Sequence, residues 1–227
     1  MRVVSPEAED TFGRQALDFS MQQMMVLPAM IRRNPVYFID DDESMRDAVL
    51  LNLRVSGLTA IGFADCKSFL STLPSLNPGC ILLDLQMPTK GGLELQAELI
   101  ERCVRWPIIV ITGTGTLESC RTAFRCGAVD FLCKPVGSDE LLSALKPAFA
   151  RLDALLECDE ASLLLHQLSP REREVFDLLW RGLSTKEIAK ALCISTRTID
   201  AHRANISSKL GTRSVAEFVQ IQMRAVL

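Results

Sequence analysis

Histidine is scarce in this sequence, and cysteine lacks the spacing that marks a metal or redox site. Only two histidines, His166 and His202, occur among 227 residues, which excludes a metal site built mainly from histidine. None of the eight cysteines forms a Cys-x-x-Cys pair, and most stand among apolar residues. We therefore expect reduced thiols in the core of a cytoplasmic protein, rather than disulfides or metal ligands.

Long apolar runs are missing as well. No stretch approaches the roughly 20 apolar residues that a membrane helix needs, so no membrane association is expected. The apolar stretch 21–31 is short, contains Pro28 and lacks the basic leader of a signal peptide. Residues 1–33 show no sustained period and are expected to form a loose tail, with a methionine between positions 21 and 30 as an alternative translation start.

Charge is distributed unevenly along the chain, whose net charge is −3. Residues 1–168 carry 15 basic and 22 acidic side chains, whereas residues 169–227 carry 10 basic and 6 acidic ones. The C-terminal part is therefore the one expected to meet a polyanion.

From Pro35 onward, two periods alternate along the chain. Short apolar runs typical of buried strands occur at Val36–Ile39, Ala60–Phe63, Cys80–Leu83, Ile108–Ile111 and Val129–Leu132. Segments with helical spacing occur at Glu43–Val55, Lys67–Leu73, Leu93–Cys103, Leu117–Cys126 and Asp139–Leu156. Wholly apolar strands indicate a parallel sheet covered on both faces. The alternation predicts a doubly wound α/β domain with five parallel strands over residues 34–152.

Polar residues follow four of these strands at the point where each one ends. The run Asp40–Asp42 comes directly after the first strand, and Asp84 follows the third. Thr112 follows the fourth strand, and Lys134 stands just beyond the fifth. Because parallel strands end at one edge of a sheet, we expect these side chains to converge near the point where the strand order reverses.

The expected acidic cluster indicates a bound cation. Crowded carboxylates are unfavourable unless a cation neutralises them, and hard oxygen ligands are those that Mg²⁺ prefers. An aspartate beside Mg²⁺ can attack phosphorus and form an acyl phosphate, while the metal and a lysine stabilise charge on the phosphoryl oxygens. The simpler interpretation, that strand-end acids cap the following helices, is favoured for Asp42 alone.

These segments together resemble the receiver domain of two-component response regulators. The resemblance covers residues 35–150 and rests on VYFIDDDE from Val36, ILLDLQMP from Ile81, VITG from Val110 and DFLCKP from Asp130. It implies a flavodoxin-like fold. It further implies that Asp84 is the phosphorylated residue, and that Asp40, Asp41 and Asp84 bind Mg²⁺ together with the backbone carbonyl of Gln86.

The same resemblance assigns a phosphoryl-binding residue and two switch positions. Lys134, fixed by a cis bond to Pro135, would pair with the phosphoryl group. Thr112 would swing toward the phosphate while the ring of Phe131 turns inward, although Phe131 as a constitutive core residue is an alternative. A sensor histidine kinase is the implied phosphoryl donor.

The C-terminal part reads as a separate helical block after a linker at 153–167. Ser169 and Pro170 suit a helix start, with Glu172 placed as in a capping box. Helical segments are expected at Pro170–Arg181, Thr185–Leu192, Thr196–Leu210 and Ser214–Arg224. The short link 193–195 separates two of these helices, as a helix-turn-helix requires.

Residues 168–227 resemble the LuxR-type DNA-binding domain. The segments are LSPREREVF from Leu168, GLSTKEIA from Gly182, ISTRTIDAHR from Ile194 and KLG from Lys209. A receiver followed by this module is the layout of the NarL/FixJ family. RTIDAHRAN from Arg197 favours the FixJ branch, and the expectation for the individual protein is a nodulation regulator.

In the helix Thr196–Leu210, the apolar residues Ile199, Ile206 and Leu210 are expected to pack inward, leaving the other face for the major groove. Asp200 would accept from a cytosine amine or repel wrong registers, and His202 would either read a base or position the backbone. The candidate DNA-binding residues are Ser184, Thr185, Lys186, Arg197, Thr198, Asp200, Ala201, His202, Arg203 and Lys209.

These features predict a DNA-binding response regulator that is phosphorylated on Asp84, dimerises and regulates promoters, acting as an activator with RNA polymerase. The alternative is a regulator that binds DNA without phosphorylation and keeps a vestigial receiver. An enzyme of the haloacid-dehalogenase type is disfavoured because Gln86 stands where a second acid is needed. A dinucleotide site is disfavoured because the third glycine after Gly113 and Gly115 is missing.

Overall fold

The computed structural model describes residues 34–88, 91–113, 116–212 and 214–225, so the predicted tail 1–33 lies outside the described residues. The chain divides into two compact units, with the division between Leu152 and Asp153. No helix in the described part of the chain has both the length and the apolar character required to cross a membrane.

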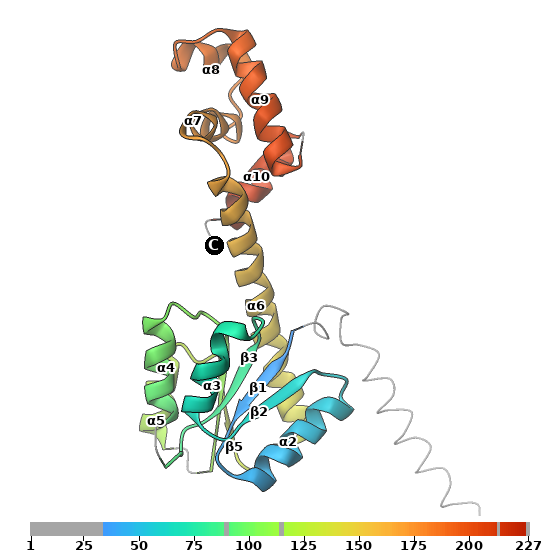
Figure 1. Cartoon of the computed structure of the whole chain (residues 1–227), viewed down its shortest axis with the longest axis vertical. Helices are drawn as coiled ribbons and strands as arrows, with labels where there is room; N and C mark the ends of the chain where they lie inside the picture. Colours follow the sequence, from blue (N-terminus) through green and yellow to red (C-terminus); the bar gives the residue numbers. More distant parts are fainter. Residues whose placement is uncertain (1–33, 89–90, 114–115, 213, 226–227) are drawn as a thin grey trace, which may run out of the picture. The chain divides into compact units, whose positions relative to one another are not determined.

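The first unit is built on a five-stranded parallel sheet (Figure 1). Its strands lie in the order β2-β1-β3-β4-β5, so the order reverses between β1 and β3. Their bounds are β1 Val36–Ile39, β2 Ala60–Phe63, β3 Cys80–Asp84, β4 Ile108–Thr112 and β5 Asp130–Cys133. Every residue of β1, β3 and β4 is buried. The unbroken apolar runs in the sequence predicted this burial, which is typical of central strands in a parallel sheet. The flavodoxin-like α/β architecture is confirmed.

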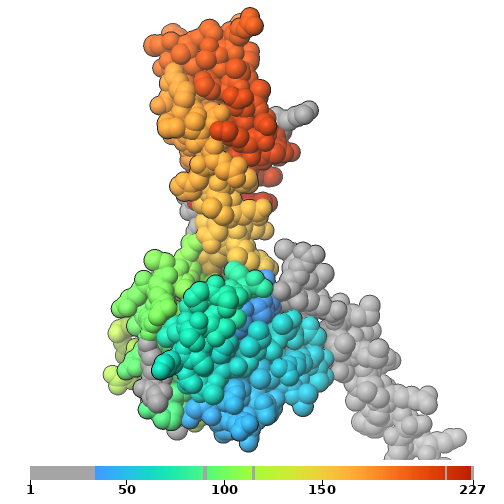
Figure 2. Space-filling view, viewed as in Figure 1, coloured from blue at the N-terminus to red at the C-terminus, as the bar shows by residue number. Residues whose placement is uncertain are grey.

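Helices cover both faces of this sheet. They are α2 Glu43–Val55, α3 Cys66–Thr72, α4 Gly92–Glu101, α5 Leu117–Arg125 and α6 Ser138–His166, with a short 3-10 turn η1 at Leu73–Ser75. Tyr37, Ile39 and Leu83 point to the face covered by α3, α4 and α5, where they form one hydrophobic cluster with those helices. On the opposite face, Gly62 leaves room for Leu50 of α2. In the space-filling view, the outer surface of this unit is formed largely by the blue-to-green part of the chain, which includes α2, α3 and α4 (Figure 2).

Two strands each include a polar residue beyond the predicted apolar run. β3 includes Asp84 and β4 includes Thr112, because Asp84 is in register with Ile111 and Thr112 with Cys133 in the backbone ladder. Ladder pairing uses main-chain groups and does not require an apolar side chain. Both polar residues are therefore held on rigid strands rather than in loops.

The prediction for the last helix of the first unit was wrong at its C-terminal end. Helix α6 was expected to end at Leu156 but continues to His166, so most of the segment predicted as a linker is helical. Cys158, Ala161 and Leu165 recur at helical spacing and are buried, and Leu165 belongs to the hydrophobic core of the second unit. Burial of this stripe stabilises helix where the sequence showed only a short apolar segment.

The described part of the second unit contains four further helices: α7 Pro170–Leu179, α8 Thr185–Ala191, α9 Thr196–Leu210 and α10 Val215–Arg224. The capping box predicted at Ser169 and Glu172 is present, and Ser184 and Glu187 form a second one before α8. Between α8 and α9, Cys193 has a φ of +53°, a left-handed conformation that usually favours glycine. Gly211, with a φ of +67°, ends α9.

The cysteines differ in part from their prediction. No disulfide joins any of the eight, all of which the structure describes, and only Cys66, Cys80 and Cys158 are buried. Cys103, Cys133 and Cys193 are exposed, at a loop or at the end of an element. An apolar sequence neighbourhood therefore did not predict burial at these three positions.

Candidate functional site

Two acids meet at the point where the strand order reverses. Asp40 directly follows β1 and Asp84 ends the neighbouring strand β3. Asp40 is 0% exposed and Asp84 is 4% exposed, so both carboxyl groups lie below the surface. In open parallel sheets, the carboxyl ends of the strands at such a reversal form the usual ligand crevice. The convergence predicted from the sequence is thus observed for these two acids.

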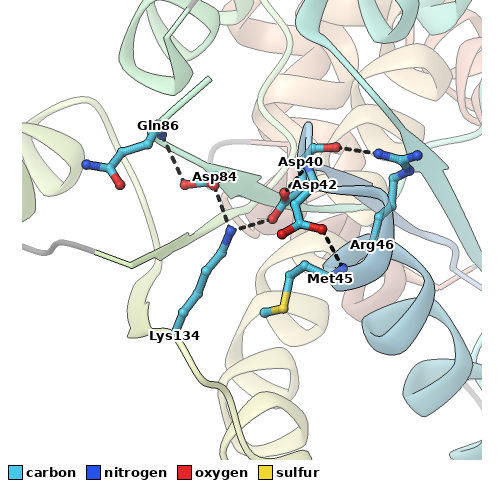
Figure 3. A network of polar contacts seen from close by, with 7 residues as sticks. All are labelled: Asp40, Asp42, Met45, Arg46, Asp84, Gln86 and Lys134. Atoms are coloured by element: carbon cyan, nitrogen blue, oxygen red, sulfur yellow. Dashed lines mark hydrogen bonds and ion pairs between the residues drawn. The ribbon is translucent and has the colours of Figure 1, made fainter. Parts of the chain in front are cut away.

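Lys134 joins the two acids (Figure 3). Its Nζ donates to Asp40 Oδ2 at 2.6 Å and to Asp84 Oδ2 at 2.7 Å. The predicted cis peptide to Pro135 is present, and the backbone N–H of Lys134 donates to the carbonyl of Thr112 at 2.9 Å. The lysine is thus placed by β5 and β4 while its ammonium group lies between the acids of β1 and β3.

Burial and pairing act against each other in this cluster. Burial raises the pKa of Asp40, and hydrogen bonds from Lys134 and from the backbone of Asp42 offset only part of that rise. For Lys134, burial lowers the pKa, but hydrogen bonds to Asp40 and Asp84 outweigh it, so the net pKa is raised. Lys134 is therefore held in its charged form, as a residue that pairs with anionic oxygen must be.

The donor set of the cluster fits a hard divalent cation. Carboxylate oxygens of Asp40, Asp41 and Asp84 lie within 4.8 Å of one another. Asp41 is exposed at the mouth while the other two are buried, which leaves an open side for water or a phosphoryl group. The backbone N–H of Gln86 donates to Asp84 Oδ1 at 3.0 Å, which places Gln86, the fourth predicted ligand, beside Asp84.

Local hydrogen bonds fix the acidic loop after β1. Asp42 caps α2, its Oδ1 accepting from the N–H of Met45 at 3.0 Å, as its simpler interpretation predicted. The N–H of Asp42 donates to Asp40 Oδ1 at 2.9 Å. Sequence reasoning missed Arg46, whose Nη1 donates to the carbonyl oxygen of Asp40 at 2.8 Å. A basic residue one turn into the helix after an acidic strand end was the available signal.

The two predicted switch residues lie on adjacent strands. Thr112 is 1% exposed, and its Oγ1 finds no hydrogen-bond partner among the residues that the structure describes. Phe131 is half-buried and packs against the cluster beneath α3, α4 and α5, with Val110 as its register partner. A buried hydroxyl without a partner, at the same sheet edge as Asp84, is suited to bind an added anionic group.

Helix α9 presents the predicted two faces. Ile199, Ile206 and Leu210 are buried in the core of the second unit. The candidate DNA-binding residues Lys186 of α8 and Arg197, Thr198, Asp200 and Ala201 of α9 are exposed. His202 is half-buried. Basic, acidic and small side chains therefore lie along one accessible surface of a helix-turn-helix.

Four other candidates make contacts within the unit. Arg203 Nη1 donates to Thr185 Oγ1 at 3.1 Å, which links α9 to α8. The hydroxyl of Ser184 is engaged in its capping box with Glu187. Lys209 Nζ donates to the side chain of Glu172 at 2.6 Å and to a backbone carbonyl at 3.1 Å. The structure therefore gives these residues an internal role beside any contact with DNA.

The first unit has the fold and polar cluster of a receiver, and the second has the helix-turn-helix of a DNA-binding domain. Residues 36–146 match the family described as response regulator receiver domain, and residues 166–222 match bacterial regulatory proteins of the luxR family. The chain belongs to the NarL/FixJ family of two-component response regulators and is of the FixJ type.

Characterised relatives agree with this assignment over most of the chain. The transcriptional regulatory protein FixJ of Bradyrhizobium diazoefficiens is 36% identical over 200 residues, covering 86% of this chain and 98% of that protein. The regulator TdiR of Thauera aromatica is 38% identical over 193 residues, covering 83% and 85% respectively. Among solved structures, the response regulator StyR has a TM-score of 0.65 at 34% identity, covering 84% of this chain and 99% of StyR. The relatives are transcriptional regulators, and the chain has the corresponding non-enzymatic role.

Proposed function

We propose that this response regulator is switched by phosphorylation of Asp84. A sensor histidine kinase presents a phosphohistidine, and a carboxylate oxygen of Asp84 attacks its phosphorus. A P–O bond forms, the P–N bond breaks, and the released imidazole takes up a proton. The observation that carries this proposal is the pairing of Lys134 with both Asp84 and Asp40, at the sheet edge where the hydroxyl of Thr112 has no hydrogen-bond partner among the described residues.

We assign Mg²⁺ to Asp40, Asp41 and Asp84, with the backbone carbonyl of Gln86 as a further ligand. When bound, this ion would neutralise negative charge on the acids and on the phosphoryl oxygens. The protein contributes Lys134, whose charged ammonium group already contacts Asp84 and is within reach of a group bound there. Thr112 supplies a hydroxyl for the same group, and Phe131 follows it as the second switch position.

The output we propose is regulation of promoters. Phosphorylation shifts the receiver toward a form that dimerises, and the dimer brings two helix-turn-helix units to two half-sites of DNA. Action on promoter DNA places the protein in the bacterial cytoplasm, where it would activate transcription together with RNA polymerase. A nodulation role for the individual protein stays a prediction, because the relatives' descriptions name only transcriptional regulation.

The test is phosphorylation of the purified full-length protein by phosphoramidate in the presence of Mg²⁺. Wild type is expected to gain the mass of one phosphoryl group and to elute as a dimer, while Asp84→Asn gains nothing. Labelling of Asp84→Asn would show that another residue is phosphorylated. If neither protein is labelled and both bind promoter DNA equally, the alternative of a vestigial receiver is correct.

A further inference from the structure

Gln96 is a buried amide in an otherwise apolar layer of the receiver. It lies on α4, is 0% exposed, and stands next to Leu95 in the cluster that fills this face of the sheet. Its Nε2 donates to the backbone carbonyl of Ala123 on α5 at 3.4 Å. Its Oε1 finds no donor among the described residues. Since an unpaired buried carbonyl is unfavourable, packing alone favours an apolar side chain at this position.

The two helices that Gln96 joins begin beside different parts of the phosphorylation site. Helix α4 starts at Gly92, where an added Cβ would lie 2.4 Å from the carbonyl oxygen of Asp84. Helix α5 starts at Leu117, a short segment after Thr112 at the end of β4. Asp84 therefore lies against the start of α4 and Thr112 precedes α5 in the chain, while the hydrogen bond of Gln96 connects the two helices inside the core.

We propose that Gln96 is a positioning residue that holds α5 against α4 in the unphosphorylated protein. The inference rests on the proposed function, in which Thr112 moves when Asp84 is phosphorylated. A single long hydrogen bond can be broken at small cost, and its loss would free α5 to follow Thr112. The hydrogen bond of the Gln96 amide is thus broken when the receiver is phosphorylated. This role explains a polar side chain where an apolar one would pack better.

Hydrogen exchange of the unphosphorylated full-length protein directly tests whether Gln96 holds α5 against α4. In Gln96→Met, an unbranched apolar replacement of similar length, amides of α5 are expected to exchange about three- to tenfold faster, the factor given by one weak hydrogen bond. Amides of β1 and β3 should exchange at the wild-type rate. Leu99→Met is the matched control, because it introduces the same residue into the same helix and core without removing a hydrogen bond. Gln96→Leu repeats the test with a second side chain.

Faster exchange of α5 in both Gln96 variants and not in Leu99→Met supports the proposal. Equal exchange in wild type and the Gln96 variants, or an equal rise in Leu99→Met, overturns it.

A second measurement compares dimerisation with and without phosphoramidate. The unphosphorylated Gln96 variants should dimerise about three- to tenfold more tightly, with the phosphorylated constants unchanged. A merely structural role would not change the ratio of these constants. If wild type does not dimerise when phosphorylated, the proposed function fails, while the exchange result still decides the role of Gln96.

Discussion

At the scale of single residues, Glu172 shows how one carboxylate can connect several elements. Its side chain is buried, accepts from Lys209 of α9, and completes the capping box with the N–H of Ser169. The hydrogen bond from Lys209 and then that from Ser169 lower the pKa of Glu172 from 4.5 to about 2. Lys209, one of the candidate DNA-binding residues predicted from the sequence, therefore stabilises the fold of the second unit.

Replacing Glu172 by Gln is expected to lower the free energy of unfolding of the second unit by about 1.5–3 kcal/mol at neutral pH, the range for a lost hydrogen bond to a charged group. Because the folded pKa is lowered, this stabilisation is complete above about pH 5 and is lost as the pH falls toward about 2. Urea unfolding followed by Trp180 fluorescence, in a Trp106→Phe background, measures the difference. A difference that does not shrink in acid would contradict the assigned ion pair.

Asp200 is the acidic exception on the exposed surface of α9. Its carboxylate has no hydrogen-bond or ion-pair partner among the described residues, and Ala201 and Ala204 beside it let the helix backbone approach a surface closely. An unpaired carboxylate is repelled by phosphates, so its favourable partner in the major groove is a base amine, such as N4 of cytosine. Asp200 is thus a candidate for base selection rather than for general affinity.

For Asp200→Asn, we expect one position of each half-site to change its preference from cytosine to adenine, because the amide pairs with N6 and N7 of adenine. Discrimination should change by about 1–3 kcal/mol at that position. Selection from a randomised half-site library with the phosphorylated full-length protein measures this. A uniform change in affinity for all sequences would instead assign Asp200 to phosphate repulsion alone.

At the scale of elements, α6 is the helix whose length the sequence did not predict. Leu165 near its end is 6% exposed and packs in the core of the second unit, whereas Leu163 is 66% exposed. Leu165→Ala is expected to lower the free energy of unfolding of the second unit by about 2–4 kcal/mol, as large-to-small changes in a core do. Leu163→Ala is the matched control and should change it by less than about 0.5 kcal/mol. The same Trp180 fluorescence measurement compares the two. Equal losses would show that residues 153–167 do not pack as a helix on this core.

At the scale of the whole molecule, one chain contains two units with different roles. The acidic receiver carries the proposed phosphorylation site, and the basic helix-turn-helix unit carries the candidate DNA-binding residues. If phosphorylation produces a dimer, binding of the second unit becomes intramolecular and affinity for a two-half-site promoter should rise about 10²-fold or more. Titration of promoter DNA with and without phosphoramidate measures the rise. Asp84→Asn and a promoter with one half-site are the controls, and neither should show it. An equal rise on the single half-site would exclude dimerisation as its cause.

The sequence by itself determined the α/β alternation, the second helical unit and the convergence of Asp40, Asp84, Thr112 and Lys134. These follow from short-range patterns, because strand and helix periods are local and parallel strands must end at one edge. The inward face of α9 follows from the same periodicity.

The tertiary structure alone decided which of these groups touch and which are occupied elsewhere. The ion pair of Lys209 with Glu172, the hydrogen bond of Gln96 to Ala123, the contact of Arg46 with Asp40 and the continuation of α6 were not predicted. Each depends on packing between residues, or on burial against elements, whose positions no local period specifies. A side chain's partner is set by the geometry of the whole unit, because a buried polar group must find its hydrogen bond wherever the fold offers one.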